Sequence, residues 1–222
     1  MKKFVGLFLA FSLCVAPVYA AGKDTDCSTA GSTVSAKYKT SAEAYRVLRK
    51  VTRELVGIQQ GRDILISDLA AKLLVYDTDI AAKKRTLANN LGTGIAEQLY
   101  VKVFDTFKVA TGENKSIFAS TSKRKTWATT QLTQLGGATF LALSSSNKLI
   151  VQTAVVGLIV NVVGSRDTQI ADNKKIVAKN ALITRQQKRI TDQTAARAKA
   201  LADFTTAQAA FELCLDTQYP VV

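Results

Sequence analysis

Between Pro17 and Pro220 the chain contains no proline. Proline normally makes up about 5% of residues, and helix interiors exclude it because its ring removes a backbone hydrogen bond and clashes with the preceding turn. A gap of this length therefore favours long, uninterrupted helices. We expect an all-α fold: an elongated, antiparallel, coiled-coil-like helical bundle with a central apolar helical hairpin.

The spacing of apolar residues within 41–131 predicts amphipathic helices. Steps that alternate between three and four residues mark a coiled-coil seam. Along the first helix they pick out Ala44, Leu48, Val51, Leu55, Ile58, Leu65 and Leu69, then, after an inserted step of four, Leu73, Tyr76, Ile80 and Leu87. Asn and Gly in 89–94 predict its end. A second helix carrying Ile95, Leu99, Val103, Phe104 and Phe107 on one face and a third at 116–135 should follow.

The segment 165–215 is predicted to form one long C-terminal helix. One row of its side chains repeats every seven residues and consists of Ile176, Ile183, Ile190, Arg197, Phe204 and Phe211. Leu201 and Leu215 are expected to supply the companion row. Packed antiparallel against the first helix, this helix would bring Cys214 close to Cys27.

The first twenty residues have the pattern of a bacterial-type signal peptide. Lys2 and Lys3 precede a short apolar run, and small residues at Val18 and Ala20 occupy the two positions that a signal peptidase reads. Cleavage after Ala20 would leave an N-terminal arm at 21–40 and a tail at 216–222. We therefore expect an exported protein, periplasmic or secreted, and membrane association is compatible with either.

Export would leave two cysteines, Cys27 and Cys214, near opposite ends of the mature chain. In an oxidising compartment the two remaining thiols of a chain usually pair. The pattern predicts an intramolecular disulfide that closes almost the whole chain into one loop. The alternative is a pair of free or intermolecular thiols.

The charge balance is strongly basic. Without Lys2 and Lys3, the formal net charge of +13 falls to +11. Such a balance favours anionic partners, and an anionic membrane surface or an envelope protein fits an exported chain. No nucleic acid is expected as a partner, because no recognisable binding motif is present. The formation of a homo-oligomer is also possible. The simpler interpretation is that the basic residues lie on solvated faces of helices.

The inventory of reactive residues predicts no enzyme, no metal site and no cofactor. The chain contains no histidine, which excludes histidine-based triads and histidine metal ligands. Two paired cysteines cannot supply the usual zinc ligand set. The pattern Ser-x-x-Lys occurs at Ser120 and at Ser145, but the motifs that accompany it in serine acyltransferases are missing.

Residues 126–165 carry one charged side chain, Lys148, within an otherwise basic sequence. Segment 132–164 is predicted to form an uncharged apolar hairpin with Lys148 at its tip. Its second arm, 149–163, is apolar on nearly every helical face, and such a helix is either buried or in lipid. At 1.5 Å per residue this arm covers about 22 Å, which is shorter than the roughly 30 Å hydrocarbon layer of a bilayer.

The hairpin is the candidate site for contact with a membrane or a partner protein. Its candidate contact residues are Phe140, Leu141, Leu143, Leu149, Ile150, Val155, Val156, Leu158, Ile159, Val160, Val162 and Val163. Two hypotheses remain open for them. Either the hairpin is the core of a helical bundle, or it inserts into or docks on a membrane or a partner.

Together these features predict an exported, non-enzymatic helical protein that binds membrane or envelope surfaces through the hairpin and the basic helices. At the level of architecture the arrangement resembles secreted α-helical pore-forming proteins, whose apolar hairpin opens on a bilayer. The resemblance implies a pore-forming or membrane-inserting action. The alternative is a structural accessory subunit of a secretion, conjugation or other envelope assembly.

Overall fold

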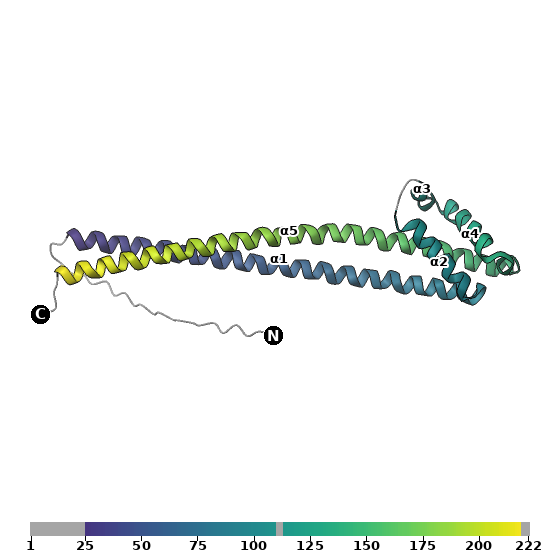
Figure 1. Cartoon of the computed structure of the whole chain (residues 1–222), viewed down its shortest axis with the longest axis horizontal. Coiled ribbons are helices and arrows are strands. Elements are labelled where there is room, and N and C mark those ends of the chain that lie inside the picture. Colours follow the sequence, from purple (N-terminus) through teal and green to yellow (C-terminus); the bar gives the residue numbers. More distant parts are fainter. Residues whose placement is uncertain (1–24, 110–112, 219–222) are drawn as a thin grey trace. The chain divides into compact units, whose positions relative to one another are not determined.

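The computed structural model describes residues 25–109 and 113–218, and every regular element in this part of the chain is an α-helix. The helices in chain order are α1 (Thr25–Leu91), α2 (Thr93–Phe107), α3 (Glu113–Ala119), α4 (Thr121–Leu141) and α5 (Ser145–Gln218), shown in Figure 1. The all-α prediction is confirmed. The proposed signal peptide, 1–20, and residues 219–222 of the proposed tail lie outside the described residues.

The two long helices extend further than the sequence pattern predicts. Helix α1 already begins at Thr25, so most of the predicted N-terminal arm is its first turns. Helix α5 is 74 residues long and starts at Ser145. The predicted boundary between 164 and 165 is therefore wrong: Gly164 continues the helix, because a lone glycine weakens a helix without ending it.

Short breaks separate the middle helices. Gly92, with a φ of 89°, divides α1 from α2 where the Asn- and Gly-rich segment predicts an end. The helix predicted at 116–135 is instead two helices, because Ser120 has extended backbone angles and caps α4. The Ser120 hydroxyl accepts a hydrogen bond from the backbone N–H of Lys123 (3.4 Å), as N-cap residues commonly do.

The chain divides into two compact units, one of residues up to Arg46 with those from Ala195 onward, and one of Val47–Thr194. In the first unit the start of α1 lies beside the end of α5. Cys27 and Cys214 form a disulfide with a Cα–Cα distance of 5.9 Å, as predicted. The Phe211 ring packs on Gly31, and a Lys37–Asp203 ion pair of 3.3 Å adds a polar contact.

In the second unit α1 and α5 run antiparallel. The Gln186 amide donates to the Val51 carbonyl (3.0 Å), Lys72 pairs with Asp172 (2.8 Å), and the Lys83 side chain would meet a Cβ at Gly157. The predicted seam of α1 faces this contact. Val51 and Leu87 are buried, and the seam residues between them are partly buried, from Leu55 to Ile80.

In the seam of α5 the predicted seven-residue row is buried or partly buried except at Arg197, which is exposed, and the predicted companion row is wrong. Ile183 of the predicted row is buried. The predicted companion Leu201 is 48% exposed, and Leu215 is also exposed. The actual companion row lies one residue earlier, and in the second unit it consists of polar residues: Asp172, Lys179, Gln186 and Gln193. A search for apolar repeats cannot find such a row.

Asp172 is buried in this seam between two lysines. Its two carboxylate oxygens accept hydrogen bonds of 2.7 Å from Lys175 and 2.8 Å from Lys72. The hydrogen bonds from Lys175 and then Lys72 lower the pKa of the Asp172 carboxyl. The hydrogen bond to Asp172 raises the pKa of Lys72 in turn.

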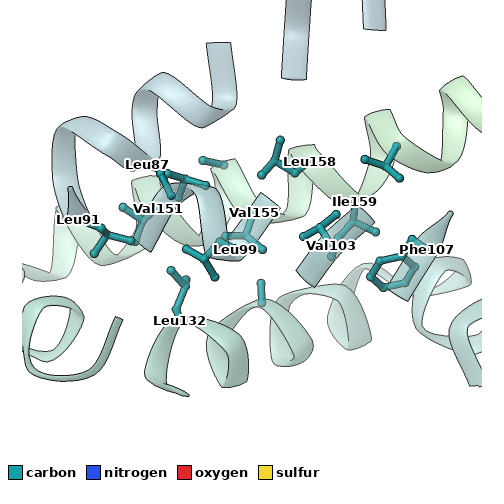
Figure 2. Packing of buried hydrophobic residues seen from close by; sticks show 14 of the residues in the cluster. Leu87, Leu91, Leu99, Val103, Phe107, Leu132, Val151, Val155, Leu158 and Ile159 are labelled. Carbon is teal, nitrogen blue, oxygen red and sulfur yellow. The ribbon is translucent and has the colours of Figure 1, made fainter. Parts of the chain in front are cut away.

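The main apolar core lies in the second unit, where the C-terminal turns of α1 meet α2, α4 and the first turns of α5. Figure 2 shows side chains from all four helices converging. The largest fully buried members are Leu87, Leu99, Val103, Phe107, Leu132, Val151, Val155, Leu158, Ile159 and Val163. This core places the beginning of α5, and with it the candidate hairpin, inside a four-helix arrangement.

Candidate functional site

The candidate hairpin is formed by the end of α4 and the beginning of α5, joined by residues 142–144. The N–H of Ala142 donates to the Ala138 carbonyl (3.0 Å) and closes α4. The Ser144 hydroxyl accepts from the N–H of Asn147 (3.2 Å) and caps α5. These two hydrogen bonds give the connection at 142–144 a local cause.

The first arm is bent at two adjacent glycines. Gly137 has a φ of 48° and a ψ of −131°, a backbone conformation that side chains disfavour, and it interrupts the helical angles of α4. Gly136 is buried, and a Cβ there would lie 2.8 Å from the Cβ of Phe140. The bend therefore turns the Phe140 ring into the core.

The structure divides the predicted contact residues into two groups. Half of them belong to the core cluster, and Val155, Leu158 and Ile159 have exposed fractions of 0%. The buried group consists of Phe140, Val155, Leu158, Ile159, Val162 and Val163, while Leu143 and Val156 are partly buried against it. In this conformation the six buried residues can contact neither a membrane nor another protein.

The remaining predicted residues are exposed: Leu141, Leu149, Ile150 and Val160. Leu141 is 60% exposed and Leu149 is 58% exposed. Leu141 ends α4, whereas Leu149 and Ile150 lie in the first turns of α5 beside Lys148. We call Leu141, Lys148, Leu149 and Ile150 the hairpin tip. It presents three large apolar side chains next to one cation.

Gln152, a polar residue within the apolar segment, has a hydrogen-bond partner on the other arm of the hairpin. The Gln152 amide donates to the Thr129 hydroxyl on α4 (2.6 Å). Thr129 in turn donates to the Lys125 carbonyl of its own helix (3.0 Å). The bond between Gln152 and Thr129 links the two arms of the hairpin at its surface.

Helix α2 is held against α5 by Arg166. The guanidinium donates to the Phe107 carbonyl at the C-terminus of α2 (2.8 Å) and pairs with Asp167. A cation at a helix C-terminus also complements the helix dipole. The Phe107 ring meets the edge of the Trp127 ring of α4 with centroids 5.2 Å apart. The sequence gives no signal for Arg166, because its partner is a backbone carbonyl 59 residues away.

The electrostatics of the site are one-sided. Between Glu113 and Asp167 the chain contains six cations and no acidic residue. The cations are Lys115, Lys123, Arg124, Lys125, Lys148 and Arg166. Lys123, Arg124 and Lys125 lie in the first turns of α4, where the helix dipole adds positive potential. Lys148 is the one of these cations that belongs to the hairpin tip, whereas Lys123, Arg124 and Lys125 lie at the opposite end of α4 from Leu141.

Side chains with reactive potential have structural partners. Ser120 caps α4 and Lys123 donates to Ser116, so the first Ser-x-x-Lys pattern serves local structure. Within 25–109 and 113–218, no three carboxylate, thiol or imidazole side chains gather as a metal site would require.

A shallow depression on α4 is lined by Thr126, Thr129, Thr130, Thr133 and Gln134. Of these hydroxyls, those of Thr126, Thr129 and Thr130 donate to their own helix.

Among the described residues one helix, α5, includes a window long and apolar enough to cross a membrane. Core helices of globular proteins meet the same criterion. No protein-family model, no curated protein and no solved structure matches the chain.

Proposed function

We propose that this chain is an exported, non-enzymatic helical protein that binds anionic membrane or envelope surfaces through the hairpin tip. The observation that carries the proposal is the exposure of Leu141, Leu149 and Ile150 on the two sides of the 142–144 connection, within a stretch of sequence that contains six cations and no acid. A globular protein gains nothing in stability from exposing three large apolar side chains there. Full burial of one such side chain is worth about 1.5–3 kcal/mol.

The proposed binding has two components that respond differently to salt. The cations of α3 and α4 would attract anionic headgroups over long range, and this attraction would disappear at high salt, because exposed charges are screened within about 3 Å at 1 M. The apolar tip would enter the headgroup region, and this contact would persist. The buried face of α5 would stay in the bundle, so the first contact requires no unfolding.

Vesicle flotation tests the proposal. The mature protein should float with vesicles that contain an anionic lipid, and part of the binding should survive high salt. The double variant Leu149→Asp and Ile150→Asp should lose the salt-resistant fraction while keeping its helical spectrum and melting temperature. The matched control, Ile170→Asp and Val177→Asp, changes two exposed apolar residues further along α5 and should bind normally. Wild-type protein that ignores anionic vesicles at every salt concentration would refute the proposal.

A structural accessory subunit of an envelope assembly is the second candidate. It is supported by large apolar side chains that α1 and α5 expose outside the hairpin, including Ile64, Leu74, Val75 and Val177. Leu74 is 67% exposed. Sedimentation over a range of protein concentrations measures self-association directly. A protein that is monomeric at every concentration would exclude a homo-oligomeric assembly. A different protein would then be the expected partner of the exposed apolar side chains.

A further inference from the structure

A further surface lies on α5 in the second unit, away from the hairpin. Two rows of exposed side chains there repeat every seven residues, and neither row contains a charged residue. The first row consists of Ile170, Val177, Thr184 and Thr191, and the second of Asn173, Asn180, Gln187 and Thr194. Neighbours in the two rows are three or four residues apart, so the rows lie side by side on one helix face. We call the two rows the uncharged stripe.

The stripe differs from the other faces of this part of α5. From Ile170 to Thr194 the helix contains eight charged residues, and none of them lies on the stripe. Two of the eight, Asp172 and Lys179, belong to the polar row that faces α1, and the other six are exposed on the remaining faces. Charge is therefore present on every outward face of this segment except the stripe.

The stripe lies on one flank of the α1–α5 contact. Gln186 faces α1, and the Glu54–Arg189 ion pair (3.6 Å) lies to one side of it. At about 100° per residue, Gln187 lies to the other side.

Helix α1 extends the stripe on this same flank. Thr52 follows Val51 as Gln187 follows Gln186, and it begins a row of uncharged residues that are again seven positions apart: Thr52, Gln59, Ile66 and Leu73. Thr52 and Ile66 are exposed, and Gln59 and Leu73 are partly buried. The flank therefore presents three uncharged rows on two helices.

The hydroxyl groups of the stripe are satisfied within α5. Thr184, Thr191 and Thr194 donate to backbone carbonyls one turn earlier, at 2.8–3.2 Å. Because these protons are bonded to the helix itself, a partner can cover the side chains without breaking a hydrogen bond. The first row is β-branched throughout, and β-branched side chains at seven-residue spacing favour close pairing of helices.

The amides of Asn173, Asn180 and Gln187 make the second row complementary to itself. A carboxamide both donates and accepts hydrogen bonds, so one amide can pair with another. A lipid surface would leave these amides without partners, which costs free energy. An acidic partner would contact cations, and the stripe has none.

We propose that this flank of the α1–α5 pair binds the same flank of a second copy of the chain. The formal net charge is +13, so two copies repel each other wherever basic faces meet. The uncharged stripe lets two copies approach without opposing like charges. An interface in which one patch meets itself is the usual arrangement in symmetric dimers. The proposal rests on the second candidate function, whose partner and surface it names, and it uses no residue of the hairpin tip.

The flank is large enough for a stable dimer. From Ile170 to Thr194 the stripe covers 24 residue steps, which is about 36 Å of helix rise. Two helices, each about 10 Å wide, give a face of roughly 700 Å² per copy, or about 1,400 Å² in the dimer. Specific interfaces bury about 1,200–2,000 Å² in total.

Sedimentation velocity over a range of protein concentrations tests the proposal on the chain from residue 21 onward. The wild type should form dimers, and added salt should strengthen them because it screens the repulsion between basic faces. The stripe variant, Val177→Lys with Thr184→Lys, should raise the dissociation constant by about tenfold or more, since like charges would oppose each other across the interface. Both side chains are exposed, so the helical spectrum should be retained. Asn180→Lys is a milder second variant.

The matched control adds the same charge to another face of the same helix. Ala171→Lys with Ala178→Lys changes two exposed residues off the stripe, and this variant should dimerise nearly as well as the wild type. Equal weakening in the two double variants would overturn the proposal, because net charge alone would then control association. Dimers that dissociate at high salt would overturn it as well.

The outcomes separate this proposal from those above. A wild type that is monomeric at every concentration would refute it and leave the membrane function intact. Dimers that persist in the stripe variant would place self-association on other side chains, so the stripe proposal would be wrong while the second candidate function would stand. At concentrations where the wild type is monomeric, the stripe variant should still float with anionic vesicles, because its hairpin tip is unchanged.

Discussion

The phenol ring of Tyr76 on α1 lies directly over Gly164 on α5. A Cβ at position 164 would come within 2.7 Å of a ring carbon, closer than real Cβ atoms approach. The Tyr76 hydroxyl accepts a hydrogen bond of 3.4 Å from Thr168, one turn further along. The missing side chain at 164 thus allows the two helices to approach where α5 leaves the apolar core.

Gly164→Ala should therefore destabilise the protein, although alanine favours helix. Overfilling a packed contact costs about 1–3 kcal/mol, and the measurement is the free energy of unfolding in urea. Gly57→Ala is the matched control, because a Cβ there meets no atom within 4 Å. It should stabilise α1 by about 0.5–1 kcal/mol through helix propensity. Equal effects of the two substitutions would contradict the close contact.

The disulfide should matter most for the first unit. Among the described residues of this unit, Cys27 and Ala200 are the buried ones, so little apolar packing holds the helix ends together. Cys27→Ser with Cys214→Ser should cost about 2–5 kcal/mol. Hydrogen exchange should accelerate mainly in 25–46 and 195–218. Without reductant, thiol labelling of the chain from residue 21 onward should detect no free cysteine; two reactive thiols per chain would disprove the bridge.

Asp172 should make stability depend on pH at the acidic end. Its pKa is lowered in the folded state, so its contribution is fully present above the unfolded pKa of about 3.9 and is lost as pH falls through the folded value. The raised pKa of Lys72 gives a contribution that is present below about pH 10.4 and is lost as pH rises through the folded value.

Asp172→Asn tests this pH dependence. The melting temperature of the variant should be lower than that of the wild type at neutral pH, and the difference should shrink as the pH falls below about 4 towards the lowered folded pKa of Asp172, at which the wild-type carboxylate is neutralised as well. Thermal melts between acidic and neutral pH provide the measurement. A difference that is constant over this range would show that the two lysine contacts do not act through charge.

Truncations should separate the two groups of hairpin residues. Leu158→Ala leaves a cavity in the core and should cost about 2–5 kcal/mol. Leu149→Ala, at the tip, should change the free energy of unfolding by less than about 0.5 kcal/mol. Chemical denaturation measures both variants. A large cost at Leu149 would indicate that the tip is packed rather than available for binding.

The seam of α1 and the cysteine pairing could be predicted because they rest on features that the sequence displays directly. Val51 and Leu87 occupy an apolar repeat, and two thiols in an oxidising compartment have few alternatives. The polar row of α5 could not be predicted, because the burial of Asp172 and Gln186 depends on partners on another helix. A hydrophobic pattern contains no information about those partners.

The candidate hairpin was only partly predictable for a related reason. Residues 149–163 are apolar on almost every face, so their sequence has no side that distinguishes interior from surface. Which residues are covered depends on where α2 and α4 lie, and that is set by the bend at Gly137 and by the contact between Arg166 and the Phe107 carbonyl. Both depend on tertiary structure.

The disulfide between Cys27 and Cys214 spans 187 residues of sequence, and this separation sets an order of events during folding. The contacts among α2, α4 and the first turns of α5 join segments close in sequence and can form early, whereas pairing distant segments first requires closing a long loop. Cys214 can reach Cys27 readily only after α1 and α5 have aligned from the core outward. The disulfide therefore forms late in folding. Its rate of formation measures how fast α1 and α5 have paired.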